Sequence, residues 1–202
     1  MWVQGSLPVS PFLDVTNIDC LNLQTRYWDW TQDAEESKSC VISLLPKAKK
    51  LKSAFSSRLL ESPVFHPVTG FGSTGVPGTY ILPEDPDGTN KFFDPASFAG
   101  CVQDGPFASR IVRLGPGKLI TDHCLVRGVD DAYKTYLSSR SVASTMKFPS
   151  YSEFHIELEG RPVTSSPRIH DGGHVAVGGE MSNFYSSPGG EPILFFFFLT
   201  LN

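Results

Sequence analysis

The sequence predicts a single domain in which short helices are joined by long irregular loops. Apolar residues recur at helical spacing in residues 41–60 and again in residues 129–141. Residues 150–160 begin with a capping box and end in glycine, the pattern of a helix with both ends marked. Strand signals are short, as in residues 111–114, and the 16 prolines and 18 glycines indicate extensive loop. A chain of 202 residues is long enough to bury one core.

Charge and hydropathy argue against several classes of function. A net charge of −4 gives no general electrostatic reason to bind nucleic acid or an anionic membrane. No run approaches the roughly 20 apolar residues that a membrane helix needs. The basic helix expected in residues 41–60 is better explained by a solvated face than by a membrane surface. No glycine pattern typical of phosphate binding occurs.

The cysteines and the N-terminal residues bear on the redox environment. None of the cysteines has CxxC spacing, so we expect no structural zinc site; they are Cys20, Cys40, Cys101 and Cys124. Residues 1–14 have neither the basic nor the apolar region of a secretory signal. We therefore expect a cytoplasmic protein with free thiols, in which Cys101 and Cys124 would pair only in an oxidising compartment.

Two histidines, His170 and His174, form the strongest candidate for a functional site. On a helix, a spacing of four residues puts both imidazoles on one face, close enough to share a metal ion. Gly172 and Gly173 between them are poor helix formers, each costing about 1 kcal/mol. HxxxH alone is a weak motif, so its meaning depends on the neighbouring sequence.

The neighbouring sequence carries several motifs in a fixed order. They are YWDWT (27–31), SPVFHPVTGFG (62–72), DGPFA (104–108), LGPG (114–117), HCLVR (123–127), YSEFHIELEG (151–160), HVAVGGEM (174–181) and YSSP (185–188). In this order and spacing they resemble the tyrosinase family of type-3 copper proteins, in its fungal form. The motifs are spread over most of the chain.

The resemblance implies a mainly α fold, a partial tyrosinase-type copper-site helical bundle with long irregular loops and minor strands. It implies one domain over residues 1–202, with an atypical N-terminus at 1–26, an apparent insertion at 38–56 and a copper-B-like region at 169–202. His170 and His174 would be copper ligands in that region. The substrate would be a small phenolic or catecholic molecule, in a tyrosinase-like oxidoreductase of fungal secondary-metabolite (aromatic polyketide) biosynthesis.

The chain departs from the family pattern at the other copper ligands. The family places three copper-A histidines before the WDWT motif, but here no histidine precedes His66. Phe197 and Phe198 stand where the family has two histidines, and a phenyl ring offers no lone pair to a metal. With two histidines left, Asp171, Glu180 or water would have to complete the copper site.

These departures leave alternatives open. The chain is a copper-dependent phenol or catechol oxidase, a non-catalytic scaffold or relic of the fold, or a mis-spliced version of a longer active enzyme. The Phe-rich tail at 195–198 is apolar and β-prone, so it is a candidate for binding a protein partner. The sequence does not choose between monophenol oxygenation and catechol oxidation.

The remaining histidines are expected to be structural. His66 stands where the family has an acid and should lie at the surface. His123 should make structural hydrogen bonds, and His155 should lie on the polar face of its helix. The aromatic residues of YWDWT should form a core plug in which the Trp N–H groups find acceptors.

Overall fold

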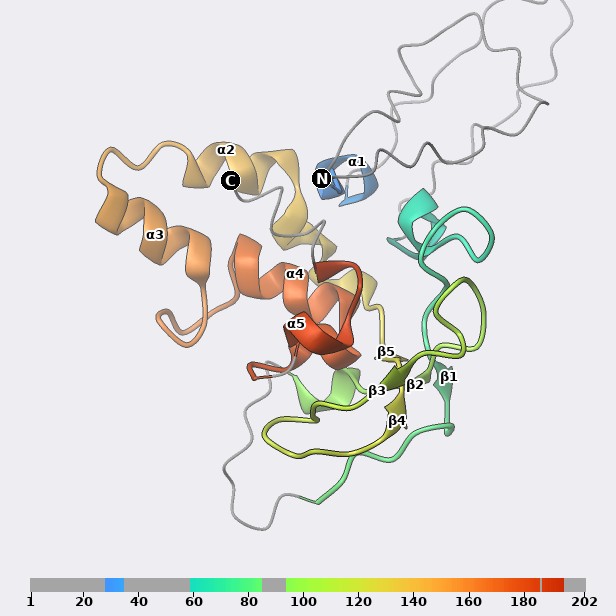
Figure 1. Ribbon diagram of the computed structural model, residues 1–202. Helices are drawn as coiled ribbons and strands as arrows, with labels where there is room; N and C mark the ends of the chain where they lie inside the picture. The colour runs from blue at the N-terminus through green and yellow to red at the C-terminus, as the bar shows by residue number, and fades with distance from the viewer. Residues whose placement is uncertain (1–27, 35–58, 85–93, 186, 195–202) are drawn as a thin grey trace, which may run out of the picture.

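Short helices and two-residue strands make up the regular structure of the computed structural model, which describes residues 28–34, 59–84, 94–185 and 187–194 (Figure 1). The α-helices are α1 (Trp30–Ala34), α2 (Ser139–Thr145), α3 (Tyr151–Glu159), α4 (Ile169–Val177) and α5 (Ser187–Gly190). The 3-10 helices are η2 (Leu59–Glu61), η3 (Pro63–Phe65), η4 (Pro95–Ser97), η5 (Asp131–Leu137) and η6 (Gly179–Ser182). The strands are β1 (Val76–Pro77), β2 (Gly100–Cys101), β3 (Ile111–Val112), β4 (His123–Cys124) and β5 (Val126–Arg127).

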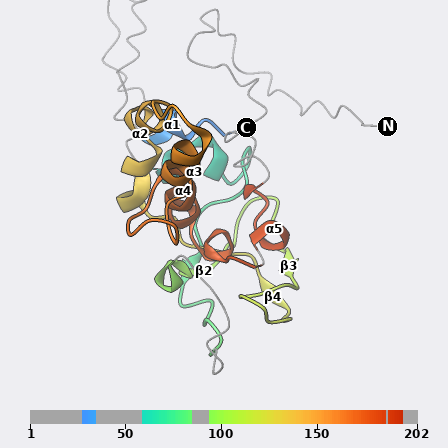
Figure 2. The same cartoon turned by 90° about the vertical axis from the view of Figure 1, so that its left-hand side faces the viewer.

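Helices α1 to α3 and the strands occupy different sides of the molecule, with α4 between them (Figure 1). Helices α1 to α3 lie on one side and the strands on the other in Figure 1, and Figure 2 shows the same separation from a perpendicular view. The main core surrounds α4 and includes Trp28, Leu59, Leu137, Val177 and Met181. The expected mainly helical fold with minor strands is confirmed. None of the described helices is long and apolar enough to cross a membrane.

The strands form two small antiparallel units. One is a three-stranded sheet in the order β1-β2-β5, and the other is the β3-β4 pair, with Ile111 opposite Cys124 and Val112 opposite His123. A disulfide between Cys101 of β2 and Cys124 of β4, whose Cα atoms are 5.6 Å apart, joins the two units. The expectation of free thiols is therefore wrong for this pair, because the fold brings together two cysteines that the sequence separates by 23 residues.

The two tryptophans of the YWDWT motif lie in the main core, as expected. Trp28 and Trp30 are 4% and 2% exposed, and their rings meet edge to face. The Trp28 indole N–H donates to the carboxylate of Asp33, which also accepts from the Ser62 hydroxyl, both at 2.7 Å. Burial raises the pKa of Asp33, although both hydrogen bonds oppose that rise. The motif thus packs α1 against η2 and η3.

A fully buried ion pair fastens three distant segments together. Arg127 of β5 donates from Nε and Nη2 to the two carboxylate oxygens of Glu191, at 3.0 and 2.9 Å. Its Nη1 donates to the carbonyls of Gly72 and Ser73, at 2.6 and 2.8 Å. Because a buried charge needs both a partner and full hydrogen bonding, Arg127 fixes the 62–72 loop and the Glu191–Pro192 segment against β5.

Of the three predicted helices, one is confirmed, one is divided into two, and one lies almost entirely outside the described residues. Residues 150–160 confirm the predicted helix and its cap at Ser150, whose hydroxyl accepts from the Glu153 N–H and donates to the Glu153 carboxylate, while Gly160 ends α3 with φ 75°. Residues 129–141 form two helices, η5 and α2, instead of one. The chain breaks at Ser138 because its hydroxyl accepts the Ser141 N–H and starts a new helix. The expected helix at 41–60, except its last two residues, lies outside the described residues, as do the regions 1–26 and 38–56.

Candidate functional site

Helix α4 positions the two candidate histidines. Its start is stabilised by Asp171, whose carboxylate accepts the Arg168 N–H at 2.6 Å, and its end by Gly178, whose N–H donates to the His174 carbonyl. A Cβ on Gly172 would come within 2.7 Å of the Tyr136 Cβ on η5. That close approach explains one of the two glycines in the helix.

The two imidazoles turn the same nitrogen toward each other. The Nε2 atoms of His170 and His174 are 3.1 Å apart, and the rings meet at 65°. Each Nδ1 has its own partner on the far side. His174 Nδ1 lies 2.6 Å from the Met181 carbonyl oxygen, and His170 Nδ1 lies 3.1 Å from the Glu159 carboxylate. Both rings are therefore held at Nδ1 and present Nε2 to a common point.

This arrangement decides which nitrogen of His174 carries the proton. A carbonyl oxygen only accepts, so Nδ1 must be the donor and the neutral ring keeps its lone pair on Nε2. Burial, and to a lesser extent the neighbouring His170, lower the pKa of His174 to about 3, while the Met181 hydrogen bond acts in the opposite direction. His174 is thus neutral at physiological pH, the form that binds a metal ion.

The histidine pair has the separation that one metal ion requires. Two nitrogens 3.1 Å apart can both lie about 2.0 Å from a single ion, the usual metal–imidazole distance. Imidazole suits copper, and a metal-bound histidine typically donates its other N–H to a carboxylate or carbonyl, as both rings do here. The pair therefore fits copper as two ligands of one ion.

The expected third ligands are engaged elsewhere. Asp171 accepts from the Arg168 N–H and from Arg161 Nε at 3.0 Å, and Glu180 contacts His123 at 2.9 Å. Among the residues that the structure describes, no three His, Cys, Asp or Glu side chains gather to hold a metal ion. The expectation that Asp171 or Glu180 completes the site is wrong for this arrangement. Phe197 and Phe198, at the family's third-ligand position, lie outside the described residues.

Glu159 and Met181 are the site residues that sequence reasoning missed. Glu159 closes the helix before the histidines, and its carboxylate reaches His170 from α3. A carboxylate in a motif leading directly to the candidate ligands was an available signal. The Met181 carbonyl carries no signal in the sequence, because any residue has one.

The other histidines behave as expected. His66 is exposed, and its Nδ1 accepts backbone N–H groups of Val68 and Thr69, at 3.2 and 3.1 Å. His155 is exposed on α3 with its ring against Tyr151. His123 makes hydrogen bonds to Glu180 and Thr121. All three structural assignments are confirmed.

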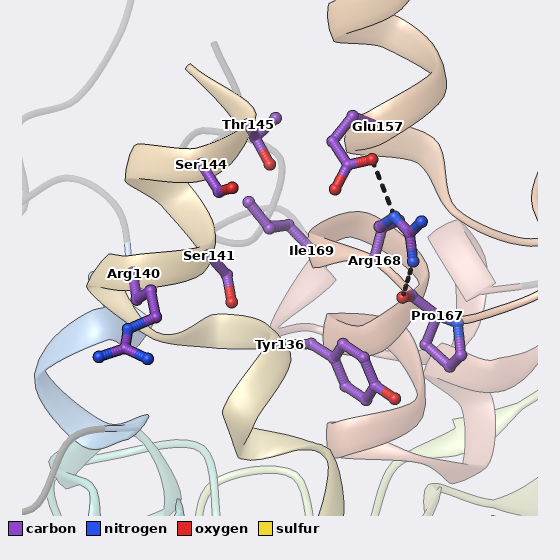
Figure 3. A pocket seen from close by; sticks show the side chains of 9 residues that line it. All are labelled: Tyr136, Arg140, Ser141, Ser144, Thr145, Glu157, Pro167, Arg168 and Ile169. Carbon is purple, nitrogen blue, oxygen red and sulfur yellow. Dashed lines mark hydrogen bonds and ion pairs between the residues drawn. The ribbon is translucent and has the colours of Figure 1, made fainter. Parts of the chain in front are cut away.

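A pocket of about 270 Å³ lies between α2, α3 and the start of α4 (Figure 3). Ser141 and Ser144 line it from α2, and Glu157 forms an ion pair with Arg168 across it. Neither candidate ligand is among its lining residues. Its volume is below the roughly 300–1,000 Å³ of most small-molecule sites, so we do not assign the substrate to it.

Comparison of the sequence with known families and proteins gives one consistent result. The family described as the common central domain of tyrosinase matches residues 14–199. N-acetyl-6-hydroxytryptophan oxidase ivoB of Emericella nidulans is 29% identical, over 80% of this chain and 45% of its own length. Tyrosinase-like protein phomQ1' of Diaporthe leptostromiformis is 29% identical, over 71% of this chain and 33% of its own length.

A solved structure supports the fold. Polyphenol oxidase (mutant G292N) from Thermothelomyces thermophila superposes with a TM-score of 0.59 at 24% identity, covering 87% of this chain and 44% of that one. Similarity at that level of identity speaks for a shared fold. The chain spans less than half the length of the relatives that it matches.

Proposed function

This chain belongs to the tyrosinase family, and we propose that it holds copper through His170 and His174 as a tyrosinase-like oxidoreductase acting on small phenolic or catecholic molecules. The observation that carries the proposal is the convergence of the two Nε2 atoms, 3.1 Å apart, with each Nδ1 already bound. One relative is named as an oxidase of N-acetyl-6-hydroxytryptophan, a hydroxylated aromatic compound. A role in fungal secondary-metabolite biosynthesis is part of the same proposal.

The chain's own residues prepare the site for the metal. Glu159 and the Met181 carbonyl hold the Nδ1 protons, and burial of His174 keeps water from competing for its lone pair. The chemistry that copper supplies in such a protein is electron transfer from the aromatic substrate to dioxygen. Because all five histidines of this chain lie in the described residues, the remaining histidine ligands of a two-copper site would have to come from a longer product of the same gene.

His170→Ala tests the metal site directly. We expect it to weaken copper binding by more than about 100-fold, beyond what loss of an outer-shell partner costs. His155→Ala is the matched control, because His155 is exposed on α3 and outside the pair. Copper retained after dialysis is the measurement. Equal retention by wild type and His170→Ala would exclude the pair as the site.

Catalysis needs a separate test, because the described residues gather only two of the family's six ligands. Oxygen consumption with a catechol should follow copper loading of the wild-type chain and be absent in His170→Ala. Copper retention without oxygen consumption would favour the non-catalytic alternative, a scaffold that keeps the fold. Sequencing the spliced transcript would then distinguish a true relic from a mis-spliced version of a longer enzyme.

A further inference from the structure

The 3-10 turn η6 carries the acceptor that orients His174. The Met181 carbonyl in this turn receives the His174 Nδ1 proton, although the two residues belong to different elements. Gly178 and Gly179 connect α4 to the turn with φ of 69° and 52°, so the chain reverses sharply between them. The direction of the His174 ring therefore depends on what holds η6 in place.

Glu180 is a polar anchor of that turn. Its Oε1 lies 2.9 Å from His123 Nε2 on β4, and the two side chains are only 0% and 7% exposed. Its other oxygen, Oε2, is buried and has no hydrogen-bond partner among the described residues. A Cβ on Gly190 would come within 2.8 Å of that oxygen, so α5 closes over the carboxylate. The hydrogen bond to His123 thus fixes the position of the Glu180 side chain.

His123 is itself held on several sides. Its Nδ1 lies 3.0 Å from the Thr121 hydroxyl, and its ring packs against Tyr80 at 5.7 Å. The next residue, Cys124, is tied to β2 by the disulfide. An anchor fixed this firmly on β4 can hold the η6 turn in place.

A contribution to stability alone does not account for the buried His123–Glu180 pair beside η6. Replacing a buried ion pair with apolar residues of similar volume is often neutral or stabilising. Ser97 also contacts the turn, with its Oγ 2.9 Å from the Ser182 hydroxyl and 3.2 Å from the Gly179 nitrogen. The His123–Glu180 contact adds a directional link at the residue next to Met181.

We propose that His123 and Glu180 are positioning residues for His174, acting through the η6 turn and the Met181 carbonyl. His123 pins Glu180, Glu180 fixes the turn, and the turn keeps the Nδ1 proton of His174 in place and its Nε2 lone pair directed at His170. The inference rests on the proposed copper site only for its effect on metal affinity. Its effect on the His174 ring exists without metal.

The first test measures the tautomer and the proton exchange of the His174 ring in the metal-free protein. In the wild type, ¹⁵N-edited NMR should show His174 as the Nδ1–H tautomer with a slowly exchanging proton. We expect His123→Phe, which keeps a ring against Tyr80 but removes Nε2, to give mixed tautomers and fast exchange. Glu180→Gln keeps the side-chain length and an oxygen that can accept from His123. This variant should therefore retain the wild-type His174 signal.

The double variant His123→Phe/Glu180→Leu separates positioning from folding. It leaves no unpaired buried charge, so we expect it to fold, yet it lacks the link and should still lose the His174 signal. Val112→Ala is the matched control, because Val112 is buried opposite His123 in the β3–β4 pair but makes no polar contact to the turn. Val112→Ala should lower the free energy of unfolding and leave the His174 tautomer signal unchanged.

Copper affinity is the second readout. We expect the copper Kd to be about tenfold higher in His123→Phe and in the double variant, which is the lower end of the range for changes to residues that contact metal ligands. A wild-type His174 signal in the double variant would overturn the inference, and so would an equal loss in Val112→Ala. If the wild type binds no copper while the NMR result holds, the proposed function fails and the positioning role stands.

Discussion

Each buried polar side chain of α4 has a dedicated partner. Asp171 is fully buried and pairs with Arg161 while it accepts the Arg168 N–H, and His174 donates to the Met181 carbonyl. The two side chains serve different ends of the helix, because Asp171 lies in its first turn and His174 in its last. Asp171 stabilises the start of the helix, and His174 turns its Nε2 toward His170.

His174 makes the stability of the metal-free protein depend on pH. Its pKa is about 3 in the fold and about 6.5 in the unfolded chain, so between these values only the unfolded state takes up the proton. The free energy of unfolding should therefore fall by up to about 1.4 kcal/mol per pH unit as pH drops below about 6.5. Urea unfolding of wild type and His174→Gln between pH 7.5 and 5 measures this. If the free energy of unfolding changed with pH by the same amount in wild type and in His174→Gln, that result would contradict the prediction.

At the scale of the elements, the connection between α3 and α4 depends on one glycine. Gly160 ends α3 at φ 75°, and a Cβ there would collide with the Asp171 carboxylate that stabilises the start of α4. The same glycine thus lets α3 bring Glu159 to His170 and leaves room for the cap of the helix that carries both histidines.

Gly160→Ala should therefore be more damaging than its backbone conformation alone explains. Gly78 is the matched control, since its φ is 81° and a Cβ there would meet no atom within 4 Å. We expect Gly78→Ala to cost about 1–3 kcal/mol of stability, the usual strain of a positive φ. Gly160→Ala should exceed about 3 kcal/mol and weaken copper binding. Equal losses in urea unfolding would rule out the collision with Asp171.

At the scale of the molecule, the helical and strand sides meet where α4 ends. The N–H groups of Gly128 and Asp130, just after β5, donate to the Val177 and Ala176 carbonyls at 3.2 and 3.0 Å. A Cβ on Gly178 would collide with the Gly128 carbonyl, so only glycine allows this approach. The two small sheets are in turn joined through the disulfide, so the strand side forms a firm support for the site.

The disulfide should contribute measurably to that support. Closing a loop of this length stabilises a protein by about 3 kcal/mol in the chain-entropy model. We expect a reducing agent to lower the urea midpoint of wild type but not of Cys101→Ser/Cys124→Ser. Alkylation and peptide mapping of the native protein would check the bond in its own compartment. A reactive Cys101 thiol there would favour a reducing compartment, whereas a disulfide would favour an oxidising one.

Features encoded within a few residues were predictable from the sequence. The capping box and terminal glycine gave both ends of α3, and the HxxxH spacing gave the facing imidazoles. The break at Ser138 was missed because apolar periodicity continues across it while its hydroxyl starts a new helix. Local signals predict an element, but they do not show where one element stops in favour of another.

Contacts between distant residues were not predictable in the same way. Asp171 and Glu180 are close to the histidines in sequence, yet their carboxylates are bound by Arg161 and His123. The partner of Glu180 lies 57 residues earlier in the chain. Which direction a carboxylate faces depends on the packing of elements, and one sequence does not contain that information in a local pattern.

The Arg127–Glu191 pair also constrains the order in which the protein can form. Arg127 precedes its carboxylate partner by 64 residues, and both side chains are completely buried in the finished fold. A nascent chain that has passed β5 but not yet reached Glu191 would have to bury an uncompensated guanidinium, a cost of about 3–5 kcal/mol. The strands and the 62–72 loop therefore reach their full stability only once Glu191 is in place against Arg127.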